Sequence, residues 1–205
     1  MQSKTAKENT PLISPDYWDH RYLNNETGWD MKQVSPPLKS YIDTIKDTNL
    51  KILIPGCGNA YEAEYLLEKG FTNVTLIDFS NVVTGKLKEK YNGKPLKIIN
   101  ENFFDHKGKY DLILEQTFFC ALHPSLQEKY VQKCYDLLND GGKIAGVFFN
   151  KKFVDTEPPY IINDAKYKKL FSHLFTFEKY EECKNSIGPR QGYEVIFILK
   201  KSKSN

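Results

Sequence analysis

A turn rich in glycine follows a short apolar run and offers a place for a ligand. The run 51–55 leads directly into Gly56, Cys57 and Gly58. Glycine has no side chain, so the backbone there can approach a bound molecule closely, and a helix that begins after the turn presents free N–H groups to it. A tight strand-to-helix turn also favours glycine without any ligand. The turn alone is therefore weak evidence for a binding site.

An acid at the end of the next apolar run indicates which ligand the turn would bind. Asp78 ends the run 74–78, about 20 residues after Gly58, where a carboxylate accepts hydrogen bonds from ribose hydroxyls in a βαβ nucleotide site. A structural role beside Ser80 at the start of the next helix is an alternative, and the two roles are compatible. Tyr61 stands where the GxGxxG pattern needs its third glycine, which argues against the pyrophosphate of NAD or FAD. S-adenosylmethionine, which has a ribose but no phosphate, fits better.

A third group follows the next expected strand. Asn102 and Phe103 lie in the segment 100–105, which in this topology reaches the adenine ring. There an amide oxygen accepts from the exocyclic amine and an apolar neighbour covers the ring. Because aromatic pairs are mostly packing, Phe103 and Phe104 are equally well explained as core residues beneath a loop.

Alternating strands and helices must position these groups. We expect helices at 16–24, 38–46, 60–69, after Ser80, at 125–138 and at 164–174, and strands at 51–55, 74–78, 96–99, 110–115, 143–149, 175–182 and 193–200. Such alternation predicts a mostly parallel, seven-stranded α/β sheet of the Rossmann-like type, with helices on both faces. The last two strands have no helix between them and are expected to form an antiparallel hairpin.

The composition is that of a globular protein. The 205 residues are 40% hydrophobic and 27% charged, with a net charge of +3 and no basic stripe, so we expect one domain at 14–205 after a flexible lead-in at 1–13, and no nucleic-acid partner. The apolar runs are too short for a bilayer and the polar start lacks a signal peptide, which predicts a cytoplasmic protein outside the membrane. We expect a monomer. The four separated cysteines predict reduced thiols, and no metal site is evident.

Several motifs resemble one known family. They are Tyr17-Trp18-Asp19, Gly28-Trp29-Asp30, Pro37-Leu38, Pro55-Gly56-Cys57-Gly58 with Tyr61-Glu62, Asp78-Phe79-Ser80, Asn102-Phe103-Phe104, and the block from Phe118 to Pro124. Together they resemble the thiopurine S-methyltransferase family, in particular its branch of plant halide and thiol methyltransferases, over nearly the whole chain. The resemblance implies a class I methyltransferase fold and an enzyme that transfers a methyl group from S-adenosylmethionine to a small soft nucleophile: a thiol, thiopurine, sulfide, halide or thiocyanate.

The resemblance also assigns roles to residues. It implies that the segment 14–37 is a lid that covers the cofactor. The residues implied to contact the cofactor are Trp18, Trp29, Gly56, Gly58, Asp78, Asn102, Phe103 and Glu115. Those expected to face the small-molecule acceptor are Trp29, Gln116, Phe119 and Arg190. The family branch usually has aspartate at position 102 and often at 115, and the plant enzymes tend to have tyrosine at 116, so the acceptor's identity stays open.

The chemistry needs no catalytic residue for a soft nucleophile. Displacement at a sulfonium requires alignment of the reacting atoms and removal of water from the acceptor, and tryptophan faces also favour the positive sulfonium. We therefore assign no catalytic base. Arg190 can pair with an anionic acceptor, although an arginine on a hairpin loop is more often exposed and solvated. The alternatives are an oxygen or nitrogen acceptor, for which Glu115 or His123 would serve as base, and a binding module without turnover.

Overall fold

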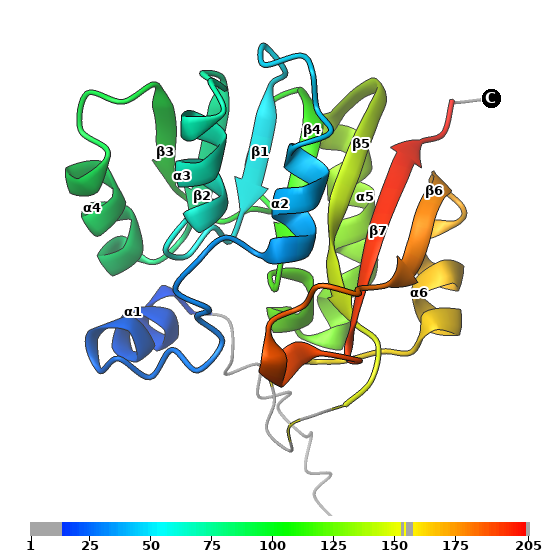
Figure 1. The fold of residues 1–205 in the computed structure, drawn as a ribbon. Helices are drawn as coiled ribbons and strands as arrows, with labels where there is room; N and C mark the ends of the chain where they lie inside the picture. The colour runs from blue at the N-terminus through cyan, green and yellow to red at the C-terminus, as the bar shows by residue number, and fades with distance from the viewer. Residues whose placement is uncertain (1–13, 153, 155–157, 204–205) are drawn as a thin grey trace, which may run out of the picture.

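The computed structural model describes residues 14–152, 154 and 158–203, and the expected lead-in at 1–13 lies outside them. These residues form a seven-stranded sheet in the order β3-β2-β1-β4-β5-β7-β6 (Figure 1). The strands are β1 (Ile52–Pro55), β2 (Val74–Asp78), β3 (Leu96–Asn100), β4 (Tyr110–Gln116), β5 (Leu138–Phe149), β6 (Phe175–Glu182) and β7 (Glu194–Lys201). Strand β7 runs antiparallel to both of its neighbours, and the other pairings are parallel.

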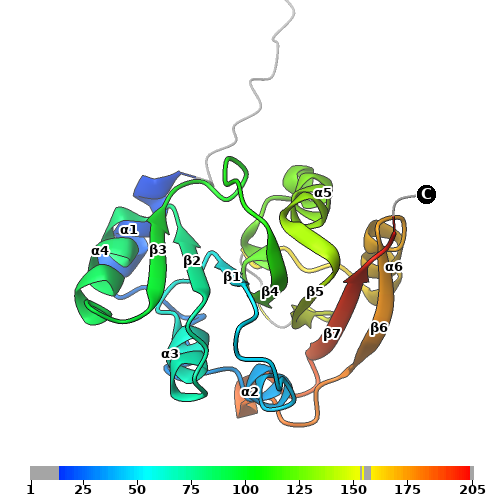
Figure 2. The ribbon, with the colours of Figure 1, turned by 90° about the horizontal axis from the view of Figure 1, so that it is seen from above.

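Helices cover both faces of the sheet, as Figure 2 shows from above. They are α1 (Pro15–Leu23), α2 (Pro36–Ile42), α3 (Tyr61–Glu68), α4 (Asn81–Lys90), α5 (Gln127–Leu137) and α6 (Asp164–Phe171). Short 3-10 turns lie at Phe119–Ala121, Pro124–Leu126 and Gly188–Arg190. Among the described residues no helix is long and apolar enough to span a bilayer.

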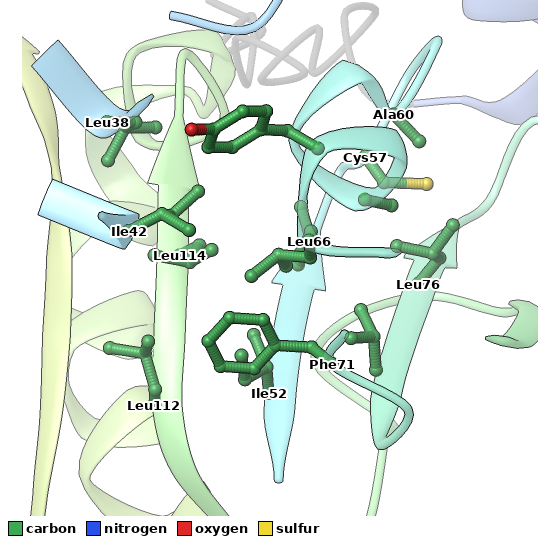
Figure 3. Close-up of a cluster of buried hydrophobic side chains, with 14 of the residues drawn as sticks. Leu38, Ile42, Ile52, Cys57, Ala60, Leu66, Phe71, Leu76, Leu112 and Leu114 are labelled. Carbon is green, nitrogen blue, oxygen red and sulfur yellow. The ribbon is translucent and has the colours of Figure 1, made fainter. Parts of the chain in front are cut away.

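The alternation of side chains along the central strands divides the core into two layers. Ile52 and Ile54 of β1 pack with α2, α3 and α4, whereas Leu53 between them packs with α5 and α6. Figure 3 shows the first layer, where Phe71 and Leu66 lie over β1 between β2 and β4. A strand buried on both faces has no polar face, which explains its continuous apolar sequence.

The predicted fold class is confirmed, with small differences at element ends. Helix α2 begins at Pro36 because proline is tolerated in the first turn, where its missing N–H has no partner to lose. Strand β5 begins at Leu138 rather than at 143, because Leu138 pairs with Tyr110 before a bulge in the ladder. The expected hairpin of the last two strands is present, and its second strand, β7, is the one that pairs with β5.

Candidate active site

A cavity of about 460 Å³ is lined in part by residues at or just after the carboxyl ends of β1, β2 and β4. The arrow of β1 points downward to this edge of the sheet in Figure 1. Ligands of open α/β sheets bind at this edge. The predicted site residues in its wall are Trp18, Trp29, Gly56, Asp78, Asn102, Phe103 and Arg190. A smaller hollow of about 60 Å³ beside the glycine turn is lined in part by Gly58 and Gln116. Glu115 and Phe119 belong to neither wall.

The glycine turn needs both of its glycines. Gly56 and Gly58 adopt positive φ angles of 55° and 49°. A Cβ atom on Gly56 would lie 2.2 Å from the ring of Phe118, and one on Gly58 would lie 2.6 Å from the hydroxyl of Tyr22. A side chain at either position would therefore be strained by the positive φ and would force a neighbouring side chain to move, so the turn presents bare backbone to the cavity and to the smaller hollow.

Asp78 is held in place by backbone N–H groups of two segments, the glycine turn and the start of α4. Its Oδ2 accepts from the N–H of Gly58 at 3.1 Å and its Oδ1 accepts from the N–H of Ser80 at 3.0 Å. Burial raises the pKa of this carboxyl, and the two backbone N–H groups oppose that effect. Each oxygen keeps a further lone pair for a hydroxyl group of a ligand.

Aromatic rings from the N-terminal segment cover the cavity. The rings of Trp18 and Trp29 meet edge to face at 5.3 Å, and Tyr22 packs against Trp29 at 5.9 Å. The guanidinium of Arg21 lies 5.2 Å from the Trp29 ring. Asp30 extends the contact to the turn after β1, since it accepts from the side-chain amide of Asn59 at 2.8 Å. The rings of Trp18 and Tyr22 both contact the ring of Trp29, and we call these three residues the aromatic cover.

Arg190 is buried, contrary to the solvated state that a hairpin loop favours. Its Nη1 pairs with Glu194 at 3.2 Å, its Nη2 donates to the backbone oxygen of Trp29 at 2.6 Å, and its guanidinium lies 5.1 Å from the Phe149 ring. The ion pair with the fully buried Glu194 neutralises the charge of the arginine inside the protein. Arg190 thus links the β6–β7 connection to the aromatic cover.

Glu115 supports the cavity from behind its wall. Its Oε1 accepts from the N–H groups of Phe118 (2.8 Å) and Phe119 (3.1 Å), and its Oε2 accepts from the Tyr130 hydroxyl at 2.9 Å. Burial raises the pKa of this fully buried carboxyl to about 7. The geometry places Glu115 as the anchor of the loop after β4, not as a group that lines the cofactor pocket.

The remaining residues of this loop have different environments. Phe119 is fully buried between Tyr130 and Phe148, with ring centroids at 5.2 and 5.3 Å, so the structure places it in the core and not beside an acceptor. Gln116 lines part of the smaller hollow, and both atoms of its side-chain amide are buried without a hydrogen-bond partner in the structure. A buried amide without a partner is costly unless a ligand or water bonds to it.

Asn102 and Phe103 line the cavity from the loop after β3. The Asn102 Oδ1 accepts from the N–H of Phe104 at 2.9 Å, an Asx turn that fixes the loop. Phe103 is both a core residue and a wall residue, with its ring edge to face with Phe118 at 5.3 Å. Both readings of Phe103 offered by the sequence are therefore compatible with its position.

Other wall residues were not singled out from the sequence. Tyr22 lies one helical turn after Trp18, so the spacing of aromatic residues on the same helix face was a usable signal. Cys120 lines the cavity and donates from its Sγ to the Thr117 oxygen at 3.3 Å, and burial raises the pKa of its thiol. All four cysteines are free and buried, as expected. Nothing in the sequence indicated that Ile187 and Pro189 would reach the same wall.

Comparison with known proteins identifies the family. The model of the family described as thiopurine S-methyltransferase matches residues 13–201. The chain belongs to this family. It is 28% identical to a probable thiol methyltransferase 2 of Arabidopsis thaliana over 91% of this chain and 85% of the relative, and 24% identical to a thiopurine S-methyltransferase of Bos taurus over 95% and 93%. The fold is similar to that of a magnesium protoporphyrin IX methyltransferase of Synechocystis, with a TM-score of 0.70, 14% identity, and coverage of 94% and 99%.

Membership in the family confirms the predicted activity, S-adenosylmethionine-dependent methyl transfer to a soft nucleophile. The residues present also fit this cofactor. The glycine turn leaves bare backbone beside the cavity, Asp78 retains lone pairs for a diol, and the amide of Gln116 lacks a partner in the adjoining hollow. A ribose and a zwitterionic amino-acid end need groups of these kinds.

Proposed function

We propose that the acceptor is a small thiol, or another soft anion, that is already ionised when it enters the cavity, so that transfer proceeds without a general base. The observation that carries this proposal is the position of the two residues that the sequence offered as bases. Glu115 is sealed behind the wall by three hydrogen bonds, and His123 lies outside the wall, where its Nδ1 bonds to Ser125. A proton acceptor must lie within hydrogen-bond reach of the proton that it removes.

The wall on the acceptor side suits such an anion. It is formed by apolar groups that include Phe118, Leu122, Phe149 and Ile187. Arg190 lies in the same wall, where its charge is already paired with Glu194. Removal of water from an anion in an apolar enclosure favours a reaction in which charge disappears. The bound cofactor supplies that reaction with a methyl group on a positive sulfur.

We further propose roles for the chain's own residues. Asp78 would accept from the ribose hydroxyls, the backbone of Gly56 and Gly58 would face the methionine moiety, and Asn102 and Phe103 would contact the adenine. Trp18 and Trp29 would exclude water, and Gln116 would bond to a polar group at the boundary of cofactor and acceptor. The positions of these residues in the two walls support these roles.

The test is a measurement of S-adenosylhomocysteine release with an acceptor panel. The panel contains an aromatic thiol, a thiopurine, sulfide, iodide and thiocyanate, with a catechol and a primary amine as oxygen and nitrogen acceptors. We expect turnover with a sulfur acceptor, at a rate that follows the ionised fraction of the thiol as pH changes. Replacement of His123 by glutamine should leave that turnover unchanged. Turnover with the catechol or amine alone, abolished in the His123 variant, would refute the proposal.

A cytoplasmic location, a monomeric state and the absence of nucleic-acid binding stay predictions. Cell fractionation, sedimentation equilibrium and a gel-shift assay with duplex DNA and RNA would test them. The division into a lid at 14–37 and a single domain at 14–205 is likewise a proposal.

A further inference from the structure

The helix that carries the aromatic cover is fastened beside the proposed ribose acid. Asp19, the residue after Trp18 on α1, uses its Oδ1 to accept from the Ser80 hydroxyl and from the backbone N–H of Val82 at 3.2 Å. Ser80 is also the N-cap of α4, since its Oγ accepts from the N–H of Val83 at 3.1 Å. The carboxylate of Asp19 therefore lies at the positive end of α4, where a negative charge is favoured.

The same serine also contacts Asp78. Its backbone N–H donates to the Asp78 Oδ1, while its side-chain hydroxyl donates to Asp19. The Asp78 Oδ2 in turn accepts from Gly58 of the glycine turn. A continuous chain of hydrogen bonds thus runs from the glycine turn through Asp78 and Ser80 to helix α1.

Helix α1 presents two cavity-lining rings from the same stretch. Trp18 precedes Asp19, and Tyr22 follows it by about one turn. The Tyr22 hydroxyl reaches the space above Gly58. Figures 1 and 2 agree that α1 lies against α4, at the edge of the sheet where the cavity opens. The orientation of both rings therefore depends on how α1 is attached to α4.

We propose that Asp19 is a positioning residue that latches the lid helix α1 to the first turn of α4, so that opening the lid for cofactor exchange requires the Asp19–Ser80 contact to break. The inference rests on the proposed role of 14–37 as a lid. Asp19 touches neither the cofactor nor the acceptor; it acts through Trp18 and Tyr22. The latch should slow the dissociation of S-adenosylmethionine and of the product S-adenosylhomocysteine alike.

The experiment compares three variants of the full chain. Asp19→Ala removes both acceptor contacts. Asp19→Asn keeps an oxygen that can accept from both donors, and is the conservative rescue. Asp16→Ala is the matched control, because Asp16 is an exposed aspartate on the same helix. Because hydrogen bonds to a charged group are among the stronger ones, Asp19→Ala should raise the dissociation rate and the Kd of S-adenosylhomocysteine about tenfold. Asp19→Asn should raise both by less than about threefold, and Asp16→Ala should change neither.

Tryptophan fluorescence gives a readout that needs no ligand. The protein has two tryptophans, Trp18 and Trp29, and both lie in the cover. Acrylamide quenching of the free protein should rise in Asp19→Ala and return to the wild-type level in Asp19→Asn. The KM for the cofactor should rise in Asp19→Ala, with kcat unchanged or increased where product release limits turnover.

Each outcome decides the inference. Increased quenching and faster dissociation in Asp19→Ala, both reversed in Asp19→Asn, support the latch. Unchanged quenching in Asp19→Ala overturns it, whether or not the melting temperature falls, because a purely structural contact would not expose the tryptophans. If the wild-type protein fails to bind S-adenosylhomocysteine, the cofactor assignment is wrong, and the quenching comparison still decides whether Asp19 holds the lid.

Discussion

Replacement of Glu115 by glutamine should stabilise the protein increasingly as the pH rises. The fully buried carboxyl has a pKa raised from its usual 4.5 to about 7, because burial disfavours its charge more than its three hydrogen bonds favour it. Glutamine can keep these bonds: its oxygen accepts from Phe118 and Phe119, and its NH₂ donates to the Tyr130 oxygen. The variant therefore removes the titration while it retains the geometry of the loop.

The sign and size follow from proton linkage. Because the folded protein binds this proton more tightly than the unfolded chain does, the favourable contribution of the group is complete below pH 4.5 and is lost as the pH rises through 7. A shift from 4.5 to about 7 corresponds to about 3 kcal/mol of unfolding free energy. Between pH 5 and pH 8, about 2.5 kcal/mol of that difference should appear.

The assay is urea unfolding followed by far-UV circular dichroism at several pH values from 5 to 8. The quantity of interest is the unfolding free energy of Glu115→Gln minus that of the wild type, since other titrating groups cancel in this difference. It should rise with pH by about 2.5 kcal/mol. Glu128→Gln, an exposed change on α5, is the control and should give a flat difference. A flat line for Glu115→Gln would show that the carboxyl is ionised throughout and would refute the reasoning.

Three further substitutions test the site. Gly56→Ala should abolish cofactor binding in calorimetry, because its Cβ would meet the Phe118 ring at 2.2 Å with φ at 55°. The helical Gly85→Ala, whose Cβ meets nothing within 4 Å, should leave cofactor binding unchanged and stabilise the fold by about 0.5–1 kcal/mol; the same cofactor affinity in both variants would count against a role of the glycine turn in binding. Phe119→Ala should cost about 3–5 kcal/mol of unfolding free energy, with little change in acceptor KM per folded molecule; a selective rise in KM would return Phe119 to the acceptor site. Asp78→Asn should weaken calorimetric binding of S-adenosylmethionine about tenfold or more, and an unchanged affinity would contradict its role at the ribose.

The sequence predicted the parts of the site that depend on local order along the chain. The glycine turn and Asp78 each end a buried strand, and the carboxyl ends of neighbouring parallel strands meet at one edge, so their proximity followed from topology. The family motifs identified the two tryptophans as site residues, whereas nothing in the sequence predicted the attachment of helix α1 through Asp19.

The loop after β4 shows why the rest was not predictable. Period-two alternation ends with the strand, and Thr117 then takes a φ of 60°, an uncommon conformation for a residue other than glycine. The turn at Thr117 decides which of Phe118 and Phe119 faces the cavity, and no sequence pattern encodes it. The burial of Arg190 was not predictable for another reason: Trp29, whose backbone oxygen accepts from its guanidinium, lies 161 residues away, and a contact over that distance has no signal in a single sequence.

The position of β7 in the sheet has a consequence for partial unfolding. Strand β6 pairs with β7, and β7 pairs with β5, so β6 is attached to the parallel strands through β7. An opening that detaches β7 from β5 therefore carries β6 away with it and leaves β5 with an open edge of unpaired N–H and C=O groups, the kind of edge that recruits other chains. The pairing of β7 with β5 thus protects the parallel strands from edge-to-edge association.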